Sequence, residues 1–238
     1  ESLATQHLQT ILLNETADAV AIMNHAAPTE LDKLAKYLLS FYRHHNQLVH
    51  FLREVIVCEV RSTNYLATLF RGNCFATKSI SGFCHAAVPS KYLETVLKDQ
   101  VVDINTTFDG NNVQPESFSA TLTRVKSIMD KIYSTEMPSE LQLIAFLLVE
   151  AMKKHGKGEL DMTSGGGASS SSESGAGDNP SEVALFGFYF LRFLCPAIVL
   201  PSAWGVLPLD SRMPPTARKV CTTISKCIQC AANNTRMK

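Results

Sequence analysis

The amino-acid sequence predicts an all-α fold, and three observations support this prediction. Apolar residues recur at steps of three and four along the long segments, which is the spacing of the buried face of a helix. Polar capping residues and prolines stand just ahead of several of these segments, where helices usually begin. No run of alternating polar and apolar residues is long enough to predict a β-strand.

The first half of the chain contains two long periodic regions. The stretch from Leu31 to Phe70 carries one apolar stripe, formed by Leu34, Leu38, Phe41, Leu48, Leu52, Val55 and Leu66. Thr29 and Asp32, three residues apart, are expected to cap its start. Residues 75–102 continue the periodicity, and the Pro89-Ser90 pair predicts a break there into two shorter helices.

Turn and cap signals divide the second half of the chain. A polar turn at 109–111 precedes a helix predicted over Ser117–Thr135. A further helix is expected from Ser139, with Gln142 as the second member of its cap, to about Lys154. The sequence Asn179-Pro180-Ser181-Glu182 predicts another start, because it places a proline at the first helical position.

Residues 163–178 differ from the rest of the chain, because they consist almost entirely of glycine, serine and alanine. This composition predicts a disordered loop. The helices on either side are too apolar to be solvated alone, so residues 1–238 are expected to form one domain with an internal loop.

The chain stops at Lys238 without a closing polar tail, and a terminal helix is expected to be missing. No signal peptide is expected, since residues 1–20 carry acidic side chains and no basic start.

Charge and cysteine content narrow the functional class. Lys and Arg number 22, as do Asp and Glu, so the formal net charge is zero. That balance argues against a nucleic-acid-binding protein, which usually carries a basic excess. The seven cysteines are an odd number in apolar contexts, which indicates reduced thiols in a cytosolic protein. Cys227 and Cys230 form a single Cys-x-x-Cys pair with no second pair or histidine nearby, so we expect core packing there and no metal.

Arg192 is the one charge in an apolar stretch that runs from residue 183 to residue 200. The stretch is about long enough to cross a bilayer. Arg192 lies at its midpoint, however, and Pro196 is expected to break the helix four residues later. Both are costly in lipid, so a buried helix is the better prediction. A buried guanidinium must either reach water or be held by several acceptors.

Arg71 is the second informative arginine. It follows the apolar stretch that ends at Leu69-Phe70, and Gly72-Asn73 after it gives a turn signal. The sequence therefore predicts an arginine that projects from a loop. Taken alone, such a residue is more often a solvated surface side chain than a functional one.

The two arginine segments together resemble the hallmarks of the Ras GTPase-activating proteins. The first reads Leu69-Phe70-Arg71-Gly72-Asn73-x-x-Ala76-Thr77-Lys78, like the finger loop of that family. The second reads Phe190-Leu191-Arg192-Phe193-x-x-Pro196-Ala197-Ile198-Val199-x-Pro201. Their order and separation match the family, as do Pro-Ser-Glu-Leu at 138–141 and the Met213-Pro214-Pro215 turn before a last helix. The sequence is most similar to the neurofibromin-like members, with Cys74, Phe75, Cys195 and Leu200 departing from the usual pattern.

The resemblance implies a protein that stimulates GTP hydrolysis by a bound Ras-family GTPase in its GTP state. The GTPase would hold the GTP and Mg²⁺, so this chain would need no cofactor and would not be a self-contained enzyme. Arg71 would act as an arginine finger, and Arg192 would support the finger loop by bonding its backbone carbonyls. The implied partner-binding residues are Lys226, Gly72, Asn73, Thr77, Lys78 and Pro196, of which Thr77 and Lys78 would also order the loop. The expected place of action is the cytoplasmic membrane surface where Ras is anchored.

Two other readings of the sequence remain open. One is a relative with the same fold that binds a GTPase without accelerating hydrolysis, although the presence of Arg71 argues against it. The other is a helical scaffold in which Arg71 and Arg192 are merely structural. The identity of the GTPase, Ras, R-Ras or Rap, does not follow from the sequence, nor does the oligomeric state.

Overall fold

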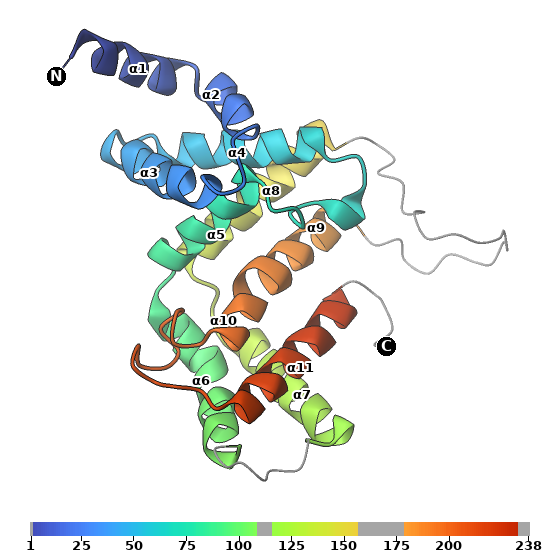
Figure 1. Ribbon diagram of the computed structural model, residues 1–238. Coiled ribbons are helices and arrows are strands. Elements are labelled where there is room, and N and C mark those ends of the chain that lie inside the picture. Colours follow the sequence, from blue (N-terminus) through green and yellow to red (C-terminus); the bar gives the residue numbers. More distant parts are fainter. Residues whose placement is uncertain (1, 109–115, 157–178, 233–238) are drawn as a thin grey trace, which may run out of the picture. The chain divides into compact units, whose positions relative to one another are not determined.

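A computed structural model describes residues 2–108, 116–156 and 179–232 of the chain (Figure 1). Every regular element among these residues is a helix, which confirms the all-α prediction. The polar turn predicted at 109–111 and the disordered loop predicted at 163–178 lie outside the described residues.

The chain forms two compact units, each built from two separate stretches of sequence. The first unit comprises residues 1–86 and 143–185, and the second comprises residues 87–142 and 186–238. Arg71 belongs to the first unit, whereas Arg192 and Lys226 belong to the second.

The first unit contains the N-terminal helices and most of two later ones. Its elements are α1 (Leu3–Asn14), α2 (Thr16–Met23), α3 (Leu31–His44), α4 (Leu48–Ser62), the 3₁₀ turn η1 (Leu66–Thr68), nearly all of α5 (Phe75–Ala87), and the larger parts of α8 (Ser139–His155) and α9 (Pro180–Phe188). The predicted start of α9 is confirmed: Pro180 is its first residue, and the Asn179 side chain accepts the Ser181 N–H at 3.1 Å.

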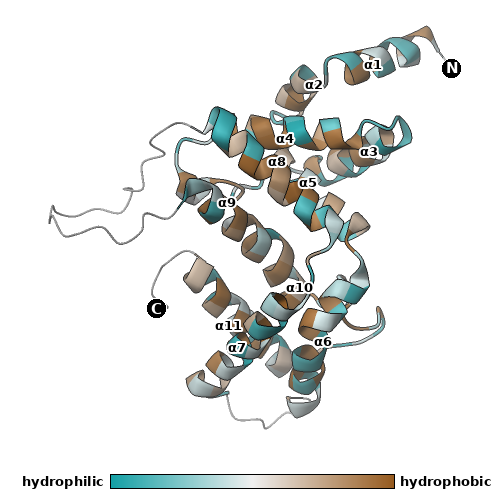
Figure 2. Ribbon diagram, turned by 180° about the vertical axis from the view of Figure 1, so that it is seen from behind, coloured by the Kyte–Doolittle hydropathy of each residue, from teal (hydrophilic) through white to brown (hydrophobic). Residues whose placement is uncertain are grey.

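Helix α4 provides the centre of the first unit and packs against α2 and α3. Its Phe51 is fully buried and stacks on Tyr42 of α3, with ring centroids 4.4 Å apart. The Tyr42 hydroxyl donates to the Leu12 carbonyl at 2.6 Å, which satisfies the polar end of a buried ring. Figure 2 shows both hydrophobic and hydrophilic turns on α3 and α4, as expected for helices with one buried face.

The prediction of one continuous periodic segment from Leu31 to Phe70 is wrong in two respects. The segment is divided into α3 and α4 by residues 45–47, where Asn46 has a left-handed φ of 57°. Apolar periodicity does not reveal this break because both helices keep their buried face toward the same core. The predicted cap is also absent: α3 begins after Glu30, which makes no side-chain capping bond, and Thr29 lies one residue earlier.

The second unit is organised around the last helix. It contains α6 (Ser90–Thr107), α7 (Phe118–Ser134), the π-helical turn η2 (Tyr189–Leu194), α10 (Cys195–Val199) and α11 (Pro215–Ala232). Helix α11 packs against α6, α7, η2 and α10. The predicted break at Pro89-Ser90 is confirmed between α5 and α6, and so is the helix predicted over Ser117–Thr135, whose Ser117 side chain accepts the Ala120 N–H.

A π-helical turn carries Arg192. The Cys195 N–H donates to the Phe190 carbonyl, five residues back, as a π turn requires. The expectation that Pro196 breaks the helix is therefore wrong, because α10 continues through it. A proline ring clashes with the carbonyl four residues earlier, which here belongs to Arg192, and the wider π turn relieves that clash.

One stretch of the described residues, Pro180–Val199, is long and apolar enough to cross a bilayer by length and composition. Within its most apolar window, 44% of the residues are buried inside the protein. A single stretch of this kind is weak evidence, because core helices of soluble proteins have the same composition. That this stretch is a buried helix stays a prediction.

The α3–α4 junction makes a first testable prediction. Asn46 is exposed and left-handed, a conformation that costs a β-branched residue about 1–2 kcal/mol and glycine almost nothing. Asn46→Val is therefore expected to lower the Tm by roughly 2–8 °C in thermal unfolding, while the control Asn46→Gly leaves it nearly unchanged. Equal losses in the two variants would contradict this account of the junction.

Candidate functional site

The most distinctive surface feature of the first unit is the loop from Leu69 to Cys74, here called the Arg71 loop. It connects η1 to α5 and contains two kinds of residue. Leu69 and Phe70 are buried, whereas Arg71, Gly72 and Asn73 are exposed. The loop is thus held by an apolar base and presents a short polar tip.

The base of the Arg71 loop is attached to a buried carboxylate on α4. Phe70 is 2% exposed, has a left-handed φ of 54°, and donates its N–H to Oε1 of Glu59 at 3.0 Å. The other oxygen, Oε2, accepts from the Cys74 Sγ at 3.2 Å. Burial first, and then the Glu59 charge, raise the pKa of the Cys74 thiol, so it stays protonated and able to donate.

Thr77 of α5 supports the same loop from a second helix. Its hydroxyl lies 2.9 Å from the carbonyl oxygens of both Gly72 and Cys74, and it accepts the Cys74 N–H at 3.2 Å. Thr77 is only 4% exposed. Its hydroxyl contacts therefore order the loop from within the fold, and a role of Thr77 in partner binding stays a prediction.

The tip of the loop presents Arg71. Its N–H donates to the Thr68 carbonyl at 3.0 Å, and its side chain is exposed. Partial desolvation by the protein lowers the pKa of Arg71 from its usual value. An arginine remains charged at neutral pH because that usual value is so high, so the loop offers a cation at the surface.

Gly72 and Lys78, which follow Arg71 in the same motif, have different surroundings. A Cβ added at Gly72 would meet no atom within 4 Å, and its φ is not left-handed, so the fold itself does not require glycine there. The Nζ of Lys78 pairs with the Asp32 carboxylate at 2.9 Å. Because Asp32 is largely exposed, this pair adds little stability, about 0–1 kcal/mol.

The second unit holds Arg192 within η2. Arg192 is half-buried, and Tyr189 and Phe193 of the same turn are buried. The Tyr189 and Tyr92 hydroxyls lie 2.7 Å apart, and burial, followed by the proximity of Tyr92, raises the pKa of Tyr189. Phe193 also meets Trp204 edge-on at 5.6 Å. The turn that carries Arg192 is thus held by packed aromatic rings.

The remaining predicted residues of the second unit are Pro196 and Lys226. Pro196 is half-buried in α10, and Lys226 is exposed on α11. Arg218, Thr222 and Lys226 follow one another at four-residue steps, so they share one side of α11, and this helix contains no acidic residue. Of the Cys-x-x-Cys pair on the same helix, Cys227 is buried and Cys230 is half-buried.

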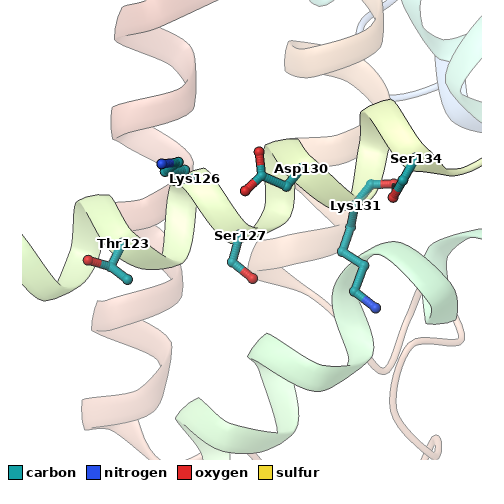
Figure 3. Close-up of a pocket in the computed structure, with 6 residues that line it drawn as sticks. All are labelled: Thr123, Lys126, Ser127, Asp130, Lys131 and Ser134. Carbon is teal, nitrogen blue, oxygen red and sulfur yellow. Dashed lines mark hydrogen bonds between the residues drawn. The ribbon is translucent and has the colours of Figure 1, made fainter.

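A separate polar hollow of about 400 Å³ lies on α7 (Figure 3). All the side chains that line it come from this helix: Thr123, Lys126, Ser127, Asp130, Lys131 and Ser134. Lys131 pairs with Asp99 of α6 at 3.5 Å. The hollow contains none of the residues that the sequence singled out, and every residue that lines it is polar or charged, whereas small-molecule sites are lined mainly by hydrophobic and aromatic residues.

Two contributors to these sites were missed in the sequence. Glu59 lies among Val55, Ile56 and Val60 on the buried face of α4, and a carboxylate in such a run is a detectable signal. The Tyr92–Tyr189 pair gave no signal, because its members are 97 residues apart.

Comparison with known proteins places these features in a family. Residues 113–233, half of the chain, match the RasGAP family, GTPase-activator protein for Ras-like GTPase. Arg192, Pro196 and Lys226 lie inside the matched segment, and Arg71 precedes it.

Individual relatives agree with the family match. The chain is 26% identical to Ras GTPase-activating protein 3 of Bos taurus over 95% of its own length and 27% of the relative. It is 26% identical to Ras GTPase-activating protein gap-2 of Caenorhabditis elegans, over 85% of this chain and 16% of that one. RAS protein activator like-3 of Homo sapiens is 29% identical over 70% of this chain and 15% of its own. The chain thus spans about a quarter of its relatives' length or less.

The Thr77 contacts make a prediction about loop order. Thr77→Val keeps the shape of the side chain and removes the hydroxyl, which leaves the half-buried Cys74 N–H without this acceptor and costs about 1 kcal/mol. The Cys74 amide is expected to exchange hydrogen faster than in the wild type, while the control Thr77→Ser, which keeps the hydroxyl, retains most of the protection. Unchanged exchange in Thr77→Val would show that this hydroxyl does not hold the loop.

Proposed function

This chain belongs to the RasGAP family of GTPase-activator proteins for Ras-like GTPases, and from that premise we propose how it acts. It binds a Ras-family GTPase in the GTP-bound state and inserts Arg71 in trans, as an arginine finger, to accelerate hydrolysis and end signalling. The observation that carries the proposal is the Arg71 loop: an exposed guanidinium on a tip whose base is buried and hydrogen-bonded.

The chemistry of arginine suits this role. Negative charge builds up on the phosphate oxygens during phosphoryl transfer, and a planar guanidinium offers several fixed donors to them. A finger arginine supplied to Ras in trans is known to be worth about 10³–10⁵ in rate. Because donors already in place need no reorganisation during the reaction, a loop held at its base supports this role.

The nucleotide and its Mg²⁺ would be held by the GTPase. The sequence contains no Gly-x-x-x-x-Gly-Lys-Ser/Thr phosphate-binding loop. On this proposal the chain supplies a catalytic side chain to another protein's active site, needs no cofactor of its own and is not a self-contained enzyme.

Arg192 is proposed as the support of the finger. The resemblance assigns to this position hydrogen bonds to backbone carbonyls of the finger loop, which would fix Arg71 before the partner arrives. The rigid setting of Arg192 in a π turn among packed aromatic rings is consistent with a supporting role.

Further partner contacts are proposed at the finger tip and on α10 and α11. Gly72 fits this role because the fold leaves the space beside it open, so its lack of a side chain matters only to a molecule that approaches from outside. The other proposed contacts are Asn73 and Lys78 of the first unit and Pro196 and Lys226 of the second. We further propose that the chain is a neurofibromin-like member of the family and that it acts in the cytoplasm at the membrane that carries the GTPase.

Replacement of Arg71 tests the catalytic proposal. Arg71→Ala is expected to lower the rate of GTP hydrolysis by Ras at saturating activator by about 10³-fold or more, with binding to GTP-loaded Ras largely kept. Arg71→Lys keeps the charge but loses the fork, and is expected to recover only part of the rate. Single-turnover release of phosphate measures both.

The exposed Arg43 of α3 offers a matched control, since Arg43→Ala removes a surface arginine of the same unit away from the loop. Its rate is expected to equal that of the wild type. Near-normal turnover by Arg71→Ala would refute the finger assignment. Binding of Ras by the wild-type chain without any acceleration would instead identify a non-catalytic binder.

Replacement of Arg192 tests the proposed support. Arg192→Met is expected to lower the saturated rate by a larger factor than it lowers the affinity for GTP-loaded Ras, because the finger remains present but is poorly placed. Lys98→Met, at an exposed position on α6 of the same unit, is the control. The fluorescence of Trp204, which packs on Phe193 of the same turn, reports whether the fold survives. Equal loss of rate and affinity would indicate misfolding and no supporting role.

A further inference from the structure

We propose that Glu59 is a positioning residue for Arg71, whose carboxylate holds both ends of the Arg71 loop. The catalytic part of this inference rests on the proposed function, because only a finger that acts on a GTPase needs a fixed place. The part that concerns loop order rests on the contacts within the first unit alone.

The two oxygens of Glu59 serve the two ends of the loop. Oε1 accepts the N–H of Phe70, the residue directly before Arg71, at 3.0 Å. Oε2 accepts from the Sγ of Cys74, three residues after Arg71, at 3.2 Å. One rigid side chain thus ties together the segments that enter and leave the exposed tip.

The burial of Glu59 costs free energy, because a carboxylate loses its hydration there. Glu59 is only 6% exposed on the inner face of α4, between fully or nearly fully buried aliphatic residues. Among the described residues, none of the ion pairs includes Glu59. A buried carboxylate is tolerated only where donors satisfy it, and the donors here belong to the Arg71 loop.

The bond to Phe70 also stabilises an unfavourable backbone conformation. A bulky residue with a left-handed φ costs roughly 1–2 kcal/mol, and Phe70 adopts it with its ring fully buried. A buried N–H left without an acceptor would cost a further ~1–3 kcal/mol. Glu59 removes that second cost, so the turn that separates the buried Phe70 from the exposed Arg71 is maintained.

Glu59 and Thr77 hold the loop from different helices. Thr77, on α5, contacts the carbonyl of Gly72 and both backbone groups of Cys74. Glu59, on α4, accepts the N–H of Phe70 in the segment that leads into the loop tip. A misplacement of a catalytic group by 1 Å can cost about 10²-fold in rate, so loss of the Phe70 contact is expected to weaken catalysis without removing the arginine.

The test compares Glu59→Leu with Glu59→Gln. Leucine removes both acceptors, whereas glutamine keeps one amide oxygen for the Phe70 N–H and is the variant more certain to fold. At saturating activator, single-turnover GTP hydrolysis by GTP-loaded Ras is expected to slow by about 10–100-fold with Glu59→Leu and by less with Glu59→Gln. The activator concentration at half-maximal rate is expected to change by less than about threefold, since the loop tip is still present.

Two controls separate positioning from simple destabilisation. Val55→Ala, at a fully buried position one turn earlier on α4, lowers stability without touching the loop, and is expected to keep the saturated rate. In the Arg71→Ala background, Glu59→Leu is expected to cause no further loss, because Glu59 acts only through Arg71. Additive losses, or an equal loss of saturated rate in Val55→Ala, would overturn the positioning role.

Hydrogen exchange in the free protein supplies a readout that does not depend on catalysis. The Phe70 amide is expected to exchange at least tenfold faster in Glu59→Leu than in the wild type, with Glu59→Gln in between. Unchanged exchange at Phe70 would overturn the inference whatever the rates are. A wild-type chain that fails to accelerate hydrolysis would refute the proposed function instead. Faster exchange of the Phe70 amide in Glu59→Leu would still show that Glu59 orders the loop. Full activity in Glu59→Leu beside an active wild type would overturn the positioning role alone.

Discussion

The proposed function requires a guanidinium at Arg71 that is exposed and yet held in a fixed place, and the first unit meets both conditions. Long exposed side chains are mobile, so immobility has to come from the backbone that carries them. The Arg71 loop meets the requirement by burying Leu69 and Phe70 directly before the exposed tip. Glu59 of α4 and Thr77 of α5 then satisfy the backbone groups that the turn leaves unpaired. The core of the unit, centred on α4, therefore holds the loop that carries the proposed finger.

The second unit meets a related constraint with different means. Arg192 lies in an apolar stretch that would bury it completely in a regular helix facing a core. Pro196 disfavours a regular helical carbonyl at Arg192, and the chain responds with a π turn in place of a break. π turns occur frequently at functional sites. The Tyr92–Tyr189 hydroxyl contact and the stacking of Phe193 on Tyr92 hold this turn in place. Arg192 is costly to bury, and its backbone is fixed by these contacts.

Sequence reasoning performed best where a local rule applies and least well where a contact spans the chain. The helix starts at Pro180 and Pro215 and the break at Pro89 follow from the fixed φ and missing N–H of proline, so they were predictable. The break between α3 and α4 was missed because two helices packed on one core share a single apolar periodicity. Thr77 was singled out by its motif, but its burial and its contacts with Gly72 and Cys74 were not visible there, since burial is not encoded in a short motif. Glu59 was visible as a carboxylate in an aliphatic run, yet its partners were not.

The sequence by itself determined the helical class, several helix boundaries and the two motifs that contain Arg71 and Arg192, because periodicity, proline geometry and long family motifs are all properties of neighbouring residues. The tertiary structure alone decided what surrounds those arginines. The bond between the Glu59 carboxylate and the Phe70 N–H joins residues 11 positions apart, and the tyrosine pair beside η2 joins residues 97 positions apart. Such contacts depend on how helices pack, and packing is a property of the whole fold that no segment of the sequence carries.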